Sequence, residues 1–358
     1  MLNPKQQKVV FFGCPLDCDE KHDAIEEKQA GGALSGTTDD PLDNVMDLIR
    51  QEVPAALWEM KGSLPVPDWL RPSPQGQARQ RLVVDEFIRF IDQDGCRQAA
   101  CEVDDFVTRQ VLPDFPCMVA VDHSLTGGAY RALARDLGEE NLTLIIVDSH
   151  TDAVPMPLLG EAIQYDIDNN PDSVYDRNDP FLYDRTDSYN ASSFIHHLLE
   201  EHILEPANLF LIGVSDYPAK RSMRLKDPRI ARYTKIYPGL KHQGGKLITK
   251  EECITKPSKL KTLLKNIETP YLYVSIDMDI GARNAVEGVR FRNWKGLAEK
   301  QIYKVIDLIC DFVPEDIQLA GMDIMEINPR RAGGHFPSGQ DRTYRVATNL
   351  IKRVAFNL

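Results

Sequence analysis

The chain has 358 residues, 42% of them hydrophobic, which is enough for a substantial buried core. Its formal net charge of -12 and its isoelectric point near 5.2 argue against a nucleic-acid or anionic-membrane partner, because both favour basic patches. No apolar run approaches the length of a membrane span, and the first residues do not form a signal peptide, so a cytoplasmic location is expected. The seven scattered cysteines predict free thiols rather than a disulfide framework.

Short β-branched or apolar runs alternate with helical patterns along the chain. Strands are expected at residues 9–12, 118–121, 144–147, 209–214, 271–276 and 318–324. Helices are expected at residues 43–52, 83–91, 129–136, 191–201, 299–312 and 344–354. This alternation predicts an α/β fold with a mainly parallel sheet.

Two segments interrupt the alternation. Residues 61–81 are rich in Pro and Gln and are predicted to form a surface excursion. Residues 153–189 hold many Asp, Asn, Pro and Tyr residues without clear periodicity, and a loop that long inside a compact domain is often functional. The motifs on both sides of these segments need one another, so a single domain spanning residues 1–358 is predicted.

The most informative motif follows the apolar run LTLIIV. Asp148, His150 and Asp152 are spaced two residues apart, so on an extended chain their side chains point the same way. Charged groups gathered at the end of a hydrophobic strand are costly unless an opposite charge compensates them. A metal cation at the carboxyl end of a parallel strand would do so.

Two further motifs repeat this arrangement at the ends of other strands. Asp277 and Asp279 follow YLYVSI, and His123 stands in a D-H-S motif after CMVAV. A single Asp at a strand end is usually a turn or helix cap, so each motif alone has that alternative. Together they offer four carboxylates and two imidazoles, which suit Mn²⁺ and are more than one ion usually takes. Two bridged ions are therefore predicted.

A fourth motif places a further carboxylate, that of Glu326, after the apolar run at 318–324. It is expected at the same edge of the sheet as the other motifs. The alternative is that Glu326 caps the next helix or pairs with Arg330 or Arg331.

These motifs, in this order, resemble those of the arginase, agmatinase and formiminoglutamase family, the ureohydrolases. The family stretches G-G-D-H-S, D-A-H-x-D, S-x-D-x-D and E-V-N-P stand here as AVDHS, DSHTD, SIDMD and MEINP. The resemblance covers roughly residues 118–358, is weak around 9–15 and is faint over about 20–115, so the chain is identified as a divergent member. It implies a three-layer α/β/α domain assembled as a trimer or hexamer.

The resemblance also implies roles for the individual residues. One Mn²⁺ would be held by His123, Asp148, Asp152 and Asp277, and the other by Asp148, His150, Asp277 and Asp279. A water between the two ions would become a hydroxide that attacks an amidine or guanidinium carbon. Glu326 matches the family glutamate that holds the cationic nitrogen of the substrate, and Asp279 would take up and pass on a proton.

Several positions depart from the family pattern. The apolar pair Ala153 and Val154 stands where arginases use an Asn to hold the amino-acid carboxylate. Ser215 replaces the arginine of the family's G-x-R-D stretch, and Pro218 replaces a further Asp near the substrate amino group. Recognition of free L-arginine in the manner of arginases is therefore not expected.

The family's loop histidine, which often shuttles protons, is replaced by Asn190, and an amide cannot titrate. His335, in the segment GGHFPSG, is a candidate substitute, with a solvent-exposed loop histidine as the alternative. The segment after SIDMD is also rewritten and contains Arg283, Arg290 and Arg292. These arginines either bind an anionic group of the substrate, contact a neighbouring subunit or balance the acidic charge of the site.

The function predicted from the sequence is that of a two-metal hydrolase that cleaves a non-peptide C–N bond of a small linear amidine or guanidino compound and releases urea. An agmatinase-like substrate is favoured over arginine. Two alternatives stay open: a formimino- or acyl-amine hydrolase on the same metal pair, and a metal-binding family member that has lost catalysis. Retention of all six ligands and Glu326 favours an enzyme, because unpaired buried carboxylates are costly.

Overall fold

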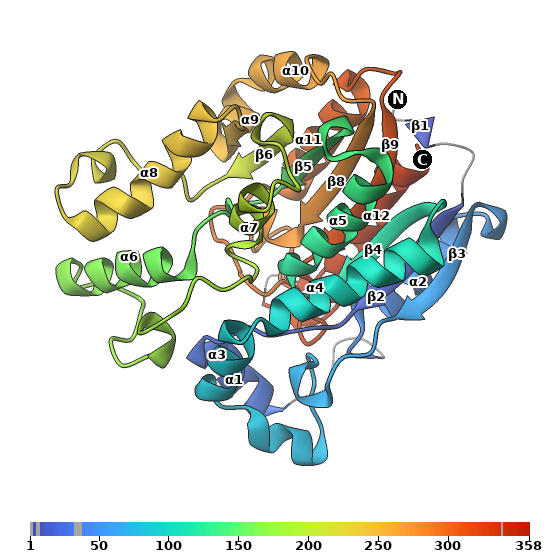
Figure 1. Cartoon of the computed structure of the whole chain (residues 1–358). Coiled ribbons are helices and arrows are strands. Elements are labelled where there is room, and N and C mark those ends of the chain that lie inside the picture. The colour runs from blue at the N-terminus through green and yellow to red at the C-terminus, as the bar shows by residue number, and fades with distance from the viewer. Residues whose placement is uncertain (1–2, 5–7, 32–37, 338) are drawn as a thin grey trace.

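A parallel sheet of nine strands forms the centre of the computed structural model, which describes residues 3–4, 8–31, 38–337 and 339–358 (Figure 1). Eight strands follow the order β3-β2-β4-β9-β8-β5-β6-β7, and β1 pairs with β9. The strands are β1 (Asn3–Pro4), β2 (Val9–Cys14), β3 (Trp58–Ser63), β4 (Phe115–Ala120), β5 (Leu142–Val147), β6 (Leu209–Val214), β7 (Lys246–Thr249), β8 (Tyr271–Asp277) and β9 (Gln318–Met325). A separate antiparallel hairpin consists of β10 (His335–Phe336) and β11 (Gly339–Gln340).

The central strands are apolar throughout because helices cover both faces of the sheet. All six residues of β4, of β5 and of β6 are buried. Successive residues point to opposite faces, so Ile145 and Val147 join one hydrophobic core while Leu144 and Ile146 join the other. The continuous apolar runs therefore supply two cores at once.

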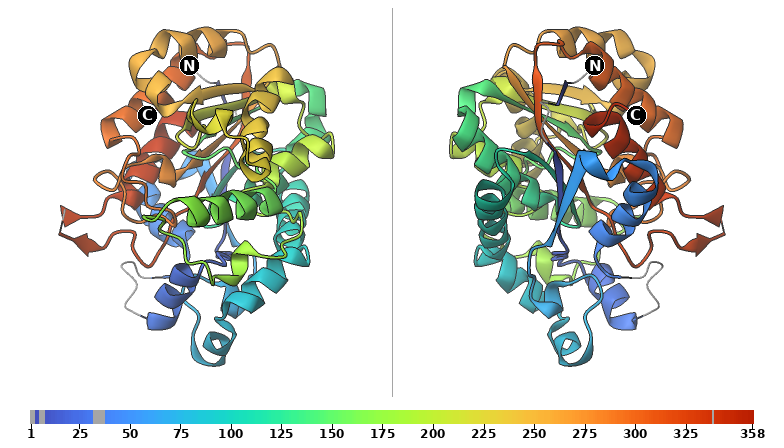
Figure 2. Two further views of the ribbon diagram at one scale, coloured as in Figure 1. Left: turned by 90° about the vertical axis from the view of Figure 1, so that its left-hand side faces the viewer. Right: turned by 90° about the vertical axis from the view of Figure 1, so that its right-hand side faces the viewer.

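Helices form the two outer layers of the molecule (Figure 2). They are α1 (His22–Ala30), α2 (Pro41–Glu52), α3 (Val84–Asp92), α4 (Gly95–Phe106), α5 (Thr126–Leu137), α6 (Met156–Asn169), α7 (Phe194–Glu200), α8 (Pro228–His242), α9 (Lys250–Thr255), α10 (Pro257–Lys265), α11 (Glu299–Phe312) and α12 (Thr343–Ala355). α2, α10, α11 and α12 pack on one face, and α4, α5, α7 and α8 pack on the other. The predicted three-layer α/β/α fold is confirmed.

All six predicted strands and all six predicted helices correspond to elements of the structure. The sequence reading missed the two-residue strands β1, β10 and β11. It also missed β3 and β7, which lie at the two edges of the eight-strand path. β3 is half-exposed along its length and β7 has four residues, so neither has the continuous apolar pattern of a central strand. It also missed α1, α4, α8, α9 and α10; α8 contains Pro238, a residue that disfavours a helix interior.

The segment 153–189 was predicted to lack regular structure, and that prediction was wrong for its first half. Residues Met156–Asn169 form α6, which projects beside α8 (Figure 1). Met156, Gly160 and Ile163 recur at helical spacing and are buried, but intervening polar residues hide the pattern in the sequence. The excursion predicted at 61–81 begins inside β3 and then forms short 3₁₀ turns, with Trp69 and Leu70 buried.

The cysteines are free thiols, as predicted, and six of the seven are buried. No helix among the described residues is long and apolar enough to cross a membrane.

Candidate metal centre

Four neighbouring strands end in polar side chains at the same edge of the sheet. His123 follows β4, Asp148 follows β5, Asp277 is the last residue of β8 and Glu326 follows β9. These strands lie side by side in the order β4-β9-β8-β5 and are all parallel. Their carboxyl ends therefore meet where open α/β sheets bind ligands.

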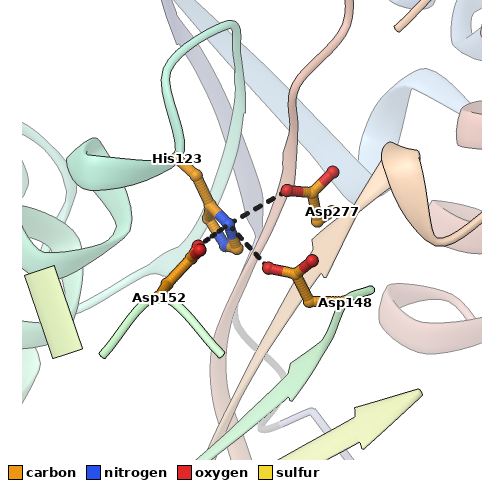
Figure 3. A group of neighbouring side chains, drawn as sticks. All are labelled: His123, Asp148, Asp152 and Asp277. Carbon is orange, nitrogen blue, oxygen red and sulfur yellow. Dashed lines mark ion pairs between the residues drawn. The ribbon is translucent and has the colours of Figure 1, made fainter. Parts of the chain in front are cut away.

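The first group of side chains surrounds the Nδ1 atom of His123 (Figure 3). Carboxylate oxygens of Asp152, Asp277 and Asp148 lie 2.8, 3.1 and 3.2 Å from this nitrogen. The four side chains are buried, and their four donor atoms lie within 4.8 Å of one another. One imidazole and three carboxylates can thus converge on a single cation.

A second group consists of Asp148, His150 and Asp279, whose donor atoms also lie within 4.8 Å of one another. His150 Nδ1 lies 2.9 Å from Asp279 Oδ2 and 3.6 Å from Asp148 Oδ1. Asp148 belongs to both groups. Asp277, which the resemblance implies as a second bridge, belongs to the first group alone in this structure, and its Oδ1 accepts a hydrogen bond from the backbone N–H of Asp279.

The carboxylates of the two groups repel one another in a buried place. Burial, together with the charges of neighbouring carboxylates, raises the pKa of Asp148 well above its usual value and that of Asp277 to about 8. Burial also acts to raise the pKa of Asp279, but the imidazole of His150 outweighs it and holds this pKa below its ordinary value. Burial acts to lower the pKa of His123, and the carboxylates around it raise that pKa far above its ordinary value. A bound cation would relieve this repulsion.

Three atoms of this centre are buried without a hydrogen-bond partner among the described residues. They are His123 Nδ1, Asp148 Oδ2 and Asp279 Oδ2. Buried polar atoms without partners are rare and costly, and each needs a physical explanation. Imidazole nitrogen and carboxylate oxygen are donors that divalent metal ions accept, so the residues present fit a metal pair.

Two serines orient the candidate ligands. Ser275 Oγ lies 2.9 Å from Nε2 of His123, the ring nitrogen that faces away from the carboxylates. Ser149 Oγ donates a hydrogen bond of 2.9 Å to Oδ1 of Asp279. Contacts of this kind fix the orientation of metal ligands. Both serines stand inside the motifs DSHTD and SIDMD, and the sequence reading passed over them.

Two side chains of the site are held by unusual backbone. Asp152 and Glu326 have φ angles of 47° and 62°, in the left-handed region that residues with a Cβ seldom adopt. Such conformations cost free energy and gather at functional sites. Neither was foreseeable from residue spacing alone.

A cavity of about 300 Å³ opens over these groups. Its floor includes His150, Asp277, Asp279 and Glu326, and His150 is 45% exposed because it faces this space. The segment 153–189 supplies much of the wall, through Val154, Met156, Leu159, Ile163, Tyr175 and Phe181. The long irregular segment is therefore part of the site.

Asn190, which replaces the family's loop histidine, and His335, its candidate substitute, lie in different places. Asn190 lines the cavity, but its amide closes its own turn by accepting from Ser192 and donating to the Ser188 carbonyl. His335 is exposed on β10 and is not part of the cavity wall. The suggestion that His335 replaces the family's loop histidine is thus not supported, because the hairpin holds it outside the cavity.

The sequence reading also missed the cationic partner of Glu326. Arg290 Nη1 lies 3.3 Å from Glu326 Oε1 and 3.0 Å from Asp122 Oδ2, and its side chain is 5% exposed. Burial raises the pKa of Glu326 well above its usual value, although Arg290 acts against it. Glu326 Oε2 is buried and without a hydrogen-bond partner in the described part of the chain. Three roles were considered for the arginines of this segment. The contacts of Arg290 match the third of them, in which an arginine balances the acidic charge of the site.

The fold and the two carboxylate–imidazole groups together define an α/β protein with a candidate two-metal centre. The model of the Arginase family matches residues 86–356, three quarters of the chain, and the chain belongs to the arginase family. The family resemblance inferred from the motifs is confirmed. A sequence search of the curated proteins found no match.

Solved structures of this family share the fold at low sequence identity. Proclavaminate amidino hydrolase from Streptomyces clavuligerus is 16% identical with a TM-score of 0.56, and the match covers 99% of this chain and 92% of that one. An arginase from Bacillus subtilis is 15% identical with a TM-score of 0.55, covering 98% of each chain. Trypanosoma cruzi formiminoglutamase with two Mn²⁺ is 15% identical with a TM-score of 0.55, covering 98% and 93%.

Proposed function

We propose that this protein is a two-metal hydrolase that cleaves a non-peptide C–N bond of a small linear amidine or guanidino compound. The observation that carries this proposal is the pair of ligand groups that share Asp148 beneath a cavity of about 300 Å³. Membership of the arginase family, whose relatives include an amidino hydrolase and an arginase, supports the reaction class.

We propose Mn²⁺ for both positions, as in the formiminoglutamase whose structure holds two Mn²⁺. The ligands would be the six residues His123, Asp148, His150, Asp152, Asp277 and Asp279. When bound, the two ions would supply Lewis acidity and lower the pKa of a water that attacks the substrate.

The protein's own residues would bind the substrate and move the proton. Glu326 lines the cavity and its Oε2 has no hydrogen-bond partner among the described residues, so this oxygen can accept a hydrogen bond from a substrate N–H. Asp279 would take up the transferred proton at Oδ1, where the hydroxyl of Ser149 lies 2.9 Å away. The apolar side chains of α6 and Phe181 would exclude water from the reacting bond.

A second candidate is hydrolysis of a formimino or acylated amine at the same centre. The Arg290–Glu326 ion pair favours the acylated amine, because a carboxylate already paired with an internal guanidinium attracts a cationic guanidino or formimino head less strongly, whereas an acyl head is neutral. A formimino or acyl head would still donate an N–H to Glu326 Oε2. The products distinguish the two reactions, since urea is released only from a guanidino compound.

The test combines metal content with product analysis. Purified protein, loaded with Mn²⁺ and desalted, is analysed by mass spectrometry beside the variants His150→Ala and His242→Ala. His242 is a matched control, because it is exposed at the end of α8 and belongs to none of the groups of described residues that could hold a metal. We expect two equivalents of metal in the wild type and in His242→Ala, and a loss in His150→Ala.

The same preparations are then screened for release of urea, ammonia and free amine from guanidino, formimino and acylated compounds. Urea from any compound would establish the guanidino reaction, whereas amine or ammonia without urea would establish the second candidate. Bound metal with no product from any class would point to a member without catalysis. Protein that takes up no metal would refute the proposal.

Two further properties are proposed, the assembly from the family resemblance and the location from the sequence. We propose a cytoplasmic homo-oligomer, a trimer or hexamer, that acts on a small molecule. Light scattering of the purified protein tests the assembly.

A further inference from the structure

A second cavity, of about 200 Å³, adjoins the metal-centre cavity. Four residues line both: Asp19, Lys21, Arg290 and Phe291. Phe291 stands at this boundary, with its ring centroid 6.2 Å from that of His150 and the Lys21 ammonium 4.3 Å above it. A short linear molecule could therefore occupy both cavities by passing along Phe291.

The second cavity is basic in a strongly acidic protein. Seven lysine and arginine side chains line it against four carboxylates, whereas the whole chain has a net charge of -12. We call it the basic cavity. A local excess of positive charge with the opposite sign to the rest of the molecule favours an anionic ligand.

Three of these cations already have partners. Lys28 Nζ lies 3.2 Å from Asp17 Oδ1, and Arg331 forms an ion pair with Glu27. Arg290 is paired with Glu326 and Asp122, as described above. The excess of positive charge must therefore come from the other basic residues.

Arg283 and Arg292 are the residues that stand out. Among the described residues no carboxylate lies within ion-pair distance of Arg283; its guanidinium stacks on Trp294 at 3.7 Å, and its Nε is buried without a hydrogen-bond partner. Arg292 has one carboxylate nearby, Glu287, at 3.9 Å. Burial lowers the pKa of Arg292, and repulsion from Arg331 and Arg283 adds to this. Planar guanidinium groups that have no close carboxylate partner suit bidentate binding of a carboxylate from a ligand.

We propose that Arg283 and Arg292 bind a carboxylate at the far end of the substrate, while its C–N group lies over the metal centre. The substrate is then an ω-substituted carboxylic acid in which a short methylene chain packs on Phe291. This assignment rests on the proposed function, because it places the reacting end of the substrate at the two ligand groups.

The first test measures binding without turnover, with glutarate as the probe. Glutarate has a carboxylate at each end and no C–N bond to cleave, so calorimetric titration into Mn²⁺-loaded protein does not depend on catalysis. The variants are Arg283→Met, Arg283→Lys and, as a matched control, Arg224→Met, an exposed arginine outside both cavities.

We expect saturable binding of glutarate to the wild type and to Arg224→Met. Arg283→Met should weaken it about tenfold or more, the loss expected for a charged hydrogen-bonding partner, and Arg283→Lys should weaken it less. Equal affinity in the wild type and Arg283→Met would overturn the proposal, since glutarate would then be held by the metal ions alone. Tighter binding of inorganic phosphate than of glutarate would overturn the assignment to a carboxylate.

The second test compares paired substrates of equal length: an ω-guanidino acid against the ω-guanidino amine, and the matching formimino pair. We expect the acid to be preferred, with Arg283→Met raising KM for the acid while kcat stays close to the wild-type value. Preference for the amine would overturn this inference and leave the proposed function intact. Glutarate binding that depends on Arg283, with no turnover of any compound, would instead refute the proposed function alone.

Discussion

The two adjoining cavities contrast in the sign of their unbalanced charge. In the metal centre, carboxylates crowd around two imidazoles, and burial with mutual repulsion raises the pKa values of Asp148 and Asp277. In the basic cavity, burial and repulsion between arginines lower the pKa of Arg292. Each region carries an excess of one sign of charge, and a ligand of the opposite sign would balance it.

The two regions also differ in how the chain builds them. The metal ligands come from three short motifs, and each motif stands at the carboxyl end of a strand. The basic cavity gathers residues 17–28, 283–292 and 328–331, which are far apart in the sequence. The contrast between the two regions can therefore be tested by substitutions that affect metal binding, ion pairing or the orientation of a metal ligand separately.

The largest effect is expected for Asp148→Asn, because Asp148 belongs to both ligand groups. The amide keeps the shape of the side chain and removes the negative charge that two cations would share. We expect loss of both metal equivalents, and a loss of activity well beyond the roughly 100-fold caused by changing a residue that merely orients a ligand. Mass spectrometry of the metal content and initial rates measure these losses.

Asp168→Asn is the matched control, since Asp168 is an exposed carboxylate on α6 outside both groups. It should keep both metals. If Asp148→Asn retained two equivalents, the shared position of Asp148 would have no functional meaning.

The next largest effect is expected for Arg290, which lines both cavities and pairs with two carboxylates. Arg290→Met would leave Glu326 and Asp122 buried without their cation. Removing one partner of a buried ion pair costs about 3–5 kcal/mol, so the free energy of unfolding should fall by that amount. Urea denaturation followed by circular dichroism measures it.

Arg283→Met supplies the comparison for Arg290→Met, because Arg283 has no carboxylate partner among the residues that the structure describes. It should change stability by less than about 1 kcal/mol. Similar losses in the two variants would mean that charge pairing does not distinguish these arginines.

A smaller effect is expected for Ser275→Ala, which removes the contact to Nε2 of His123. The imidazole loses the group that fixes its orientation, and metal affinity should fall roughly 10- to 100-fold. Competition with a metal chelator measures the affinity. Ser258→Ala, on the exposed side of α10, should leave it unchanged, and an unchanged affinity in Ser275→Ala as well would remove Ser275 from the site.

The sequence predicted the metal centre better than the basic cavity, because the two regions depend differently on local residue spacing. Alternation of side chains along a strand is a local rule, so the spacing of Asp148, His150 and Asp152 was enough to predict a cluster. The central strands were predictable because burial on both faces demands continuous apolar runs. The edge strands β3 and β7 carry a weaker signal because one side of each has no neighbouring strand.

The basic cavity has no local rule behind it. The position of Arg290 beside Glu326 depends on how the chain after β8 folds back, where Val289 forms a β-bridge with Ile327. Lys21 and Lys28 reach the same place from the segment where the family resemblance is faint. Contacts between such distant segments follow from tertiary packing, and residue spacing does not encode them.

The smallest effect is expected for an ion pair at the surface, where water surrounds the carboxylate and its cationic partners. Glu52 on α2 lies 2.9 Å from Lys352 Nζ on α12, and this hydrogen bond, with Arg345 nearby, lowers the pKa of Glu52 below 4.5. Because its pKa is lower in the folded state, Glu52 contributes its full stability above pH 4.5 and loses it as the pH falls through the folded-state pKa. Glu52→Gln should therefore lower the free energy of unfolding by about 1 kcal/mol or less at pH 7, and by less in acid. Urea denaturation of both proteins at pH 7 and pH 4 measures this, and a loss as large as that of Arg290→Met would show that burial does not set the strength of these pairs.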